Sequence, residues 1–165
     1  MTNKVVTLWY RAPELLLGAK EYGTSVDMWA IWCIFAELLL CKPLFPGRTE
    51  TMQLSMIYKL LGEPNDVVWP GYSSLPNAQL LKKADVPPRS VRDKRYYQEH
   101  SFRRLRDFFK NKVSESGLRL LQQLLTYDPH ERISASEALN HEYFHTKPYP
   151  ASTLAMPTFP PSFKE

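Results

Sequence analysis

The sequence predicts a mainly α-helical fold, and three observations support this prediction. Apolar residues recur at helical spacing in several segments, whereas no segment keeps the apolar and polar alternation of a strand. Capping residues precede those segments, and Gly or Pro residues follow them. With 165 residues, 44% of them apolar, the chain is long enough for one domain with a core. The apolar stretch 31–40 is too short for a bilayer and contains Glu37, so no membrane contact is expected.

The first long helix is expected from Ser25 to near Cys41. Thr24 and Ser25 offer hydroxyl caps, and Asp27 places an acid in the first turn. The apolar residues that follow fall on almost every face of the helix: Met28, Trp29, Ile31, Trp32, Ile34, Phe35, Leu38 and Leu39. Because a helix that is apolar all round must be buried, we expect this helix to lie in the core.

A second helix is expected from Thr49 to Leu61, with Gly62 as its stop. The proline-rich stretch after it predicts a long irregular connection to about residue 112, with one short helix around Leu105 and Phe108.

Two more helices are expected near the carboxy terminus. Ser114 begins one that runs through Leu125. The stretch 134–137 reads as a capping box, and it opens a last helix toward Phe144. Five of the eighteen residues from Pro148 onward are proline, which predicts an extended tail.

The positive charge is concentrated in residues 82–112. This segment holds eleven Lys or Arg against four acids, an excess of +7, while the rest of the chain is at −3. Such a segment can meet phosphate backbones or acidic partners, or it can be a solvated loop. No base-stacking or groove-reading motif accompanies it, so nucleic-acid binding is disfavoured.

The two cysteines, Cys33 and Cys41, have a spacing that suits neither a zinc knuckle nor a disulfide. We expect buried free thiols and no metal site.

Sequence motifs connect the chain to a known family. Residues 5–14, V-V-T-L-W-Y-R-A-P-E, contain the A-P-E triplet that closes a protein-kinase activation segment. The other motifs are D-x-W at 27–29, K-P-L-F-P-G at 42–47, L-G-x-P at 61–64, W-P-G at 69–71, L-x-Y-D-P-x-x-R-I-S-A at 125–135 and H-x-Y-F at 141–144. Over nearly its whole length the chain resembles the carboxy-terminal lobe of cyclin-dependent kinases of the CMGC group. It is most similar to the PISSLRE type, with the PITSLRE type second.

The resemblance implies the helical carboxy-terminal lobe of the protein-kinase fold, without the amino-terminal β lobe. Residues 1–145 would be a partial kinase domain with a basic insertion near 82–112, and residues 146–165 a proline-rich tail. The sequence contains no glycine-rich phosphate loop, V-A-I-K lysine, H-R-D aspartate or D-F-G aspartate. ATP and Mg²⁺ are therefore implied for the whole kinase, and neither is expected to bind this chain alone, which lacks catalytic residues.

The resemblance also implies partners. They are protein substrates with Ser/Thr-Pro sites and, for the whole kinase, a cyclin M-like cyclin. The subcellular location that the resemblance implies is the nucleus, the cytoplasm or both. The process that it implies for the whole kinase is the cell cycle.

Four residues match positions that recognise substrate or regulate the segment. Thr2 falls where such kinases carry the activating phosphothreonine. The negative charge of the phosphate can form ion pairs with arginine side chains. Val5, Val6 and Arg11 match the pocket for the proline that follows the phosphorylated Ser or Thr.

Four others match internal contacts of the kinase fold. Thr7 and Asp27 match residues that contact the catalytic loop, although Asp27 can equally serve as a first-turn acid. Glu14 and Arg132 match a buried ion pair in which a guanidinium meets a carboxylate bidentately.

One position departs from the family. Trp32 stands where the family has glycine, and an indole there is expected to overpack the core by about 1 to 3 kcal/mol or force a rearrangement.

Two functions fit these observations. The first is a piece of a proline-directed serine/threonine kinase whose catalytic half is lost by truncation or an incomplete gene model. The second is a non-catalytic interaction module that uses its docking face or its basic segment. Nucleic-acid binding is a third and less favoured possibility.

Overall fold

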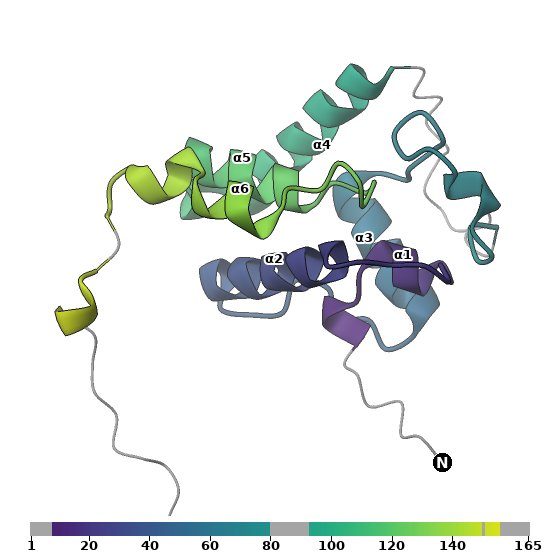
Figure 1. The fold of residues 1–165 in the computed structure, drawn as a ribbon, viewed down its shortest axis with the longest axis horizontal. Coiled ribbons are helices and arrows are strands. Elements are labelled where there is room, and N and C mark those ends of the chain that lie inside the picture. Colours follow the sequence, from purple (N-terminus) through teal and green to yellow (C-terminus); the bar gives the residue numbers. More distant parts are fainter. Residues whose placement is uncertain (1–7, 80–92, 150, 156–165) are drawn as a thin grey trace, which may run out of the picture.

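The structure is a computed structural model that describes residues 8–79, 93–149 and 151–155. All regular elements in this part are helices, as predicted (Figure 1). The α-helices are α1 (Pro13–Leu16), α2 (Ser25–Leu40), α3 (Glu50–Leu61), α4 (Lys94–Phe109), α5 (Glu115–Leu124) and α6 (Ala135–Leu139). Short 3-10 helices are η1 (Leu8–Tyr10), η2 (Tyr72–Ser74), η3 (Lys110–Lys112), η4 (Glu142–His145) and η5 (Thr153–Ala155).

Helix α2 lies at the centre, with η1 on one side and α5 packed against it on another (Figure 1). Its inward face carries the fully buried Trp29, Trp32 and Cys33. The boundaries match the prediction, but the hydroxyl cap does not form, because the Thr24 side chain accepts no capping hydrogen bond.

The prediction that α2 is buried on every side is wrong for the described part of the chain. Ile31 and Ile34 are each 50% exposed, and Leu38 is 74% exposed. Spacings of three and four residues place them in one stripe along the helix. In the described part of the chain the neighbours of α2 cover its other side only, which leaves this apolar stripe, here called the α2 stripe, open.

Helix α3 begins and ends at the predicted signals. The Thr49 side chain accepts a hydrogen bond from the Met52 N–H at 3.1 Å. Gly62 follows the helix at φ +92°, a backbone angle that favours glycine. The hydroxyls of Tyr97 and Tyr127 donate to the Gly62 carbonyl at 3.0 and 2.9 Å, so the end of α3 is fixed to α4 and to the loop after α5.

Helix α4 corrects the prediction of an irregular basic connection with one short helix. It spans sixteen residues, and Asp93 caps it by accepting from the Arg95 N–H at 2.9 Å. Its buried face is the narrow i, i+4 row Tyr97, Ser101, Leu105 and Phe109. Because the row contains the polar Ser101 and the rest of the helix is charged, apolar periodicity does not reveal this helix. The basic residues from Lys94 onward therefore lie on a helix and not in a loop.

Helices α5 and α6 begin as predicted, with Ser114 and Ser134 as amino-terminal caps. The capping box of α6 is complete, because Glu137 bonds back to Ser134. The last helix was predicted to reach Phe144, but α6 ends at Leu139. A new turn starts at His141, whose Nδ1 accepts from the Tyr143 N–H at 3.1 Å.

The two thiols differ in their surroundings. Cys33 is buried, as predicted, and burial raises the pKa of its thiol to about 12. Cys41 is exposed, so the prediction of burial is wrong there. No helix among the described residues is long and apolar enough to cross a membrane.

Candidate functional site

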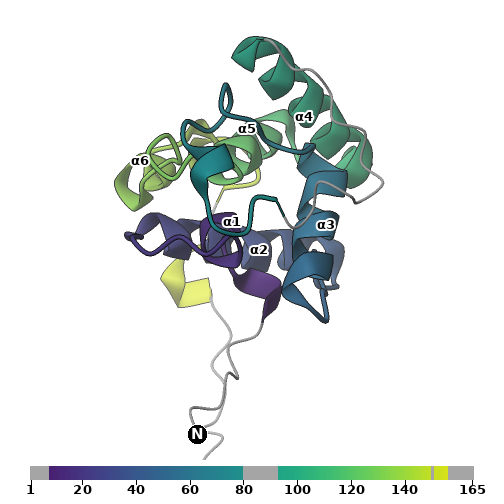
Figure 2. The same cartoon turned by 90° about the vertical axis from the view of Figure 1, so that its right-hand side faces the viewer.

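The candidate site is the stretch 8–14, which directly follows the segment 1–7, where four of the eight predicted site residues lie. Thr2, Val5, Val6 and Thr7 lie outside the described residues, so their roles stay predictions. In the stretch 8–14, η1 packs on α2 and α3, and Pro13 and Glu14 begin α1, which packs on α3 (Figure 2).

Trp9 is held by a closed set of hydrogen bonds. Its indole Nε1 donates to the Gly47 carbonyl at 3.2 Å, and its own carbonyl accepts from Gln53 Nε2 at 3.1 Å. Gln53 Oε1 completes the set by accepting from the Gly47 N–H at 3.0 Å, and the Gln53 side chain is fully buried. A Cβ at Gly47 would lie 2.7 Å from the Gln53 Cα, so this position has no room for a side chain.

Tyr10 and Arg11 reach two different helices. The Tyr10 hydroxyl donates to Glu37 Oε2 on α2 at 2.7 Å, and this hydrogen bond raises the pKa of Tyr10. Arg11 Nη1 lies 2.8 Å from Glu50 Oε1 in the first turn of α3. The guanidinium of Arg11 is therefore engaged with α3, and its predicted part in a proline pocket stays a prediction.

Glu14 and Arg132 form the ion pair that the sequence comparison implied. Arg132 Nη1 donates to Glu14 Oε1 at 2.7 Å, and Nη2 donates to Oε2 at 3.0 Å. The side chains are 0% and 3% exposed, so the pair lies in the protein interior. Two parallel bonds to one carboxylate are the strongest arrangement that an arginine makes.

The remaining donors of Arg132 go to backbone carbonyls. Nε donates to Thr126 at 3.0 Å, Nη1 to Ser25 at 2.7 Å and Nη2 to Tyr127 at 3.3 Å. The guanidinium carbon also lies 5.2 Å from the centre of the Trp29 ring. All five N–H groups of the guanidinium are thus satisfied, and one side chain joins α1, α2 and the loop after α5.

Asp27 lies exposed in the first turn of α2. Within the described part of the chain its carboxylate makes no ion pair. The helix dipole favours an acid there, and its predicted contact with a catalytic loop stays a prediction.

Sequence reasoning missed the residues that hold Trp9, Tyr10 and Arg11. One signal was available, since Gln53 is a polar residue on the apolar face of its helix. No contact was predicted from the sequence for Glu37 or Glu50. The contacts of stretch 8–14 are structural hydrogen bonds and ion pairs, so the arrangement fixes the course of a segment and offers no free acid or base.

Comparisons with known proteins agree with this geometry. The model of the protein kinase domain family matches residues 1–144. The chain is 49% identical over 160 residues to cyclin-dependent kinase G1 of Arabidopsis thaliana, covering 97% of this chain and 25% of that protein. It is 46% identical over 159 residues to the serine/threonine-protein kinase PITSLRE of Drosophila melanogaster, covering 96% of this chain and 16% of that protein.

A solved structure is also similar. A chain in the CAK complex from Chaetomium thermophilum, bound to ATP-γ-S, matches with a TM-score of 0.72 and 37% identity. The match covers 92% of this chain and 43% of that chain. This chain therefore spans a quarter or less of the two curated relatives and under half of the solved one.

Proposed function

Because the chain belongs to the protein kinase family, and within it to the cyclin-dependent type, we propose that it is the helical, substrate-docking part of a proline-directed serine/threonine kinase. In the whole kinase, ATP and Mg²⁺ would serve the transfer of a phosphoryl group to a Ser or Thr followed by Pro. The observation that carries this proposal is the fixed course of residues 9–14.

Each anchor of that stretch comes from a different part of the domain. Trp9 is tied to Gly47 and α3, Tyr10 to α2, and Glu14 to Arg132. A recognition pocket formed by the neighbouring Val5 and Val6 would need such a base, because binding groups must be held in place by residues that are themselves locked. The anchors therefore support a role in presenting substrate.

The α2 stripe supports the proposal that further chain completes the domain. Three large apolar side chains on one helix face are a contact surface or a liability in a free protein.

Catalysis by this chain alone is not proposed. Phosphoryl transfer depends on positioning and on charge stabilisation by metal ions, and the sequence has none of the motifs that supply them. The proposed partners of the whole kinase are a cyclin of the M type and proteins with Ser/Thr-Pro sites, in the nucleus or the cytoplasm.

A chimaera tests the proposal. The part of Arabidopsis thaliana cyclin-dependent kinase G1 that precedes the matched region would be joined to this chain, supplied with a cyclin, and assayed with ATP and Mg²⁺. We expect a Ser-Pro peptide to be phosphorylated about tenfold or more faster than its Ser-Ala counterpart, because only proline fits the pocket. The isolated chain is the control and should show no transfer.

Two results would contradict the proposal. One is a folded, ATP-binding chimaera that phosphorylates both peptides equally. The other is micromolar binding of ATP·Mg²⁺ by the isolated chain, which would mean that a nucleotide site exists without the family motifs.

A non-catalytic interaction module is the second candidate. The observation that favours it is the basic helix α4, which forms one wall of a groove on the surface.

A further inference from the structure

A groove of about 470 Å³ runs between α4 and α5. Its apolar floor is made by Leu61, Val68, Tyr97, Leu105, Leu125 and Tyr127. Phe102, only partly buried, forms part of the α4 wall. A groove of this size, with apolar and aromatic lining and a polar rim, is typical of a binding site.

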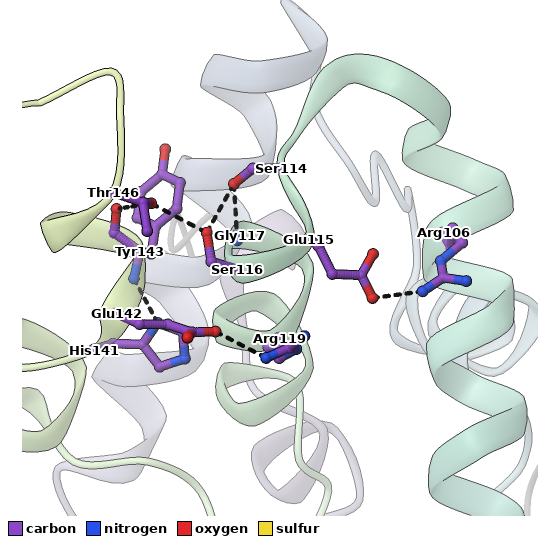
Figure 3. A network of polar contacts seen from close by, with 10 residues as sticks. All are labelled: Arg106, Ser114, Glu115, Ser116, Gly117, Arg119, His141, Glu142, Tyr143 and Thr146. Atoms are coloured by element: carbon purple, nitrogen blue, oxygen red, sulfur yellow. Dashed lines mark hydrogen bonds and ion pairs between the residues drawn. The ribbon is translucent and has the colours of Figure 1, made fainter.

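Contacts on both sides of α5 fix the width of the groove. Toward α4, Lys94 bonds both carboxylate oxygens of Glu131, and Gln122 Nε2 donates to the Gln98 carbonyl at 2.8 Å. Arg106 pairs with Glu115 at the amino-terminal end of α5 (Figure 3).

On the far side of α5, two contacts reach the η4 region (Figure 3). The hydroxyls of Ser116 and Thr146 lie 3.3 Å apart, and Arg119 pairs with Glu142 at 3.1 Å. Because α5 is braced from two directions, the groove exists before any ligand binds, which lowers the entropic cost of binding.

The rim of the groove on α4 is positively charged. The lining holds three cations, Lys94, Arg95 and Arg119, against two acids, Glu99 and Glu131, and this net charge of +1 favours an anion. Arg95 on the rim is 84% exposed, and among the described residues its side chain pairs only with Glu99, at 3.4 Å. Arg119 on α5 also lines the groove, and its exposed pair with Glu142 is weak enough to exchange partners.

The chain itself offers no acidic occupant. Its segments outside the described residues carry four basic residues and one acid in 80–92, one lysine in 1–7, and one of each sign in 156–165. A second copy has a net charge of +4 and would be repelled. Neither these segments nor a second copy complements the charge of the groove, so an acidic occupant is sought outside these 165 residues.

We propose that the α4–α5 groove binds an acidic peptide segment of a partner protein that carries one aliphatic or aromatic anchor. The anchor packs on Phe102 and the apolar floor, while the carboxylates of the segment meet Arg95 and Arg119. This inference does not rest on the proposed kinase activity, so the two can fail separately.

The test uses the full chain and two short fluorescein-labelled peptides of Glu and Asp. One has a single central Phe, and the other has Ser in its place. Fluorescence anisotropy should show that the Phe peptide binds about tenfold more tightly or better, because only it buries an aromatic ring. Equal affinity of the two peptides would overturn the proposal.

Two charge reversals on α4 form a matched pair. Arg95→Glu alters the rim of the groove, whereas Arg103→Glu makes the same change at an exposed residue that does not line it. We expect Arg95→Glu to weaken binding of the Phe peptide about tenfold and Arg103→Glu by less than about threefold. If both substitutions weakened binding equally, the peptide would be binding through the net charge of α4 alone, and the proposed groove site would be wrong.

A third variant, Gln98→Trp, fills the groove from the exposed side of α4 without changing charge. It should abolish the preference for Phe over Ser while circular dichroism shows an intact helical spectrum. An oligonucleotide that displaces the Phe peptide from the parent chain and binds equally well after Gln98→Trp would show a general polyanion surface instead.

Discussion

Replacing Arg132 with alanine is expected to lower the free energy of unfolding by about 3 to 5 kcal/mol. The substitution leaves the carboxylate of Glu14, 3% exposed, without its cation. It also removes the donors to the carbonyls of Ser25 and Thr126. An uncompensated charge in the interior costs far more than the pair contributes, and denaturant unfolding measures the difference.

A surface arginine provides the matched control. Arg119 also pairs with a glutamate, but both side chains are at least half exposed, so Arg119→Ala should cost less than about 1 kcal/mol. Glu14→Ala should lower the free energy of unfolding about as much as Arg132→Ala, because it leaves the buried Arg132 charge without its partner. Arg132→Lys should recover only part of the loss, since an ammonium group cannot make the bidentate bond. If Arg132→Ala and Arg119→Ala gave equal midpoints, the buried pair would have no structural role.

Replacing Trp32 with glycine is expected to cost about 3 kcal/mol or more, as truncation of a buried aromatic residue does. The indole is fully buried, and its centre lies 5.8 Å from that of the Phe109 ring. Helix α2 continues through this position without a break. The overpacking expected from the sequence therefore has no visible counterpart, and the indole fills space beside α4 that glycine would leave empty.

Two opposing effects must be separated in this experiment. Glycine also lowers helix propensity by about 1 kcal/mol, which Ala30→Gly on the same helix measures. The Trp32 indole N–H is buried without an acceptor in the described part of the chain, so removing it returns some free energy. Trp32→Phe isolates that gain while keeping most of the ring. A Trp32→Gly protein as stable as the parent would instead support the overpacking expected from the sequence.

The helices that could be predicted are those whose signals are local. Thr49 and Gly62 bound α3, and Ser114 caps α5, as their sequence contexts indicated. Helix α4 was missed because its buried row includes Ser101 and its surface is charged. For α2 the apolar pattern predicted a buried helix. It did not indicate which face of the helix contacts other elements, because that depends on the rest of the fold.

The site was predictable only where the family resemblance supplied it. The pair of Glu14 and Arg132, separated by 118 positions, came from matching motifs and is confirmed. The set of Trp9, Gly47 and Gln53 depends on three-dimensional contacts that no local pattern encodes. The cyclin-dependent type is confirmed by the comparisons, whereas the choice of PISSLRE over PITSLRE stays a prediction.

If the chain is one part of a kinase fold, the α2 stripe is the surface on which the rest of that fold packs. Leu38→Glu should disrupt this surface, and Leu154→Glu is the matched control, because Leu154 is 96% exposed and lies outside α2. Both can be compared with the parent chain before and after the addition of a partner. The partner is the part of Arabidopsis thaliana cyclin-dependent kinase G1 that precedes the matched region.

The decisive measurement is hydrogen exchange of the α2 backbone amides over residues 31–38, with hydrophobic-dye fluorescence recorded in parallel. We expect the isolated chain to bind the dye, and the partner to remove that binding and slow the exchange. Leu38→Glu should abolish both effects of the partner, and Leu154→Glu should change neither. A monomeric chain that melts cooperatively, binds no dye and shows unchanged α2 exchange when the partner is added would contradict the proposal.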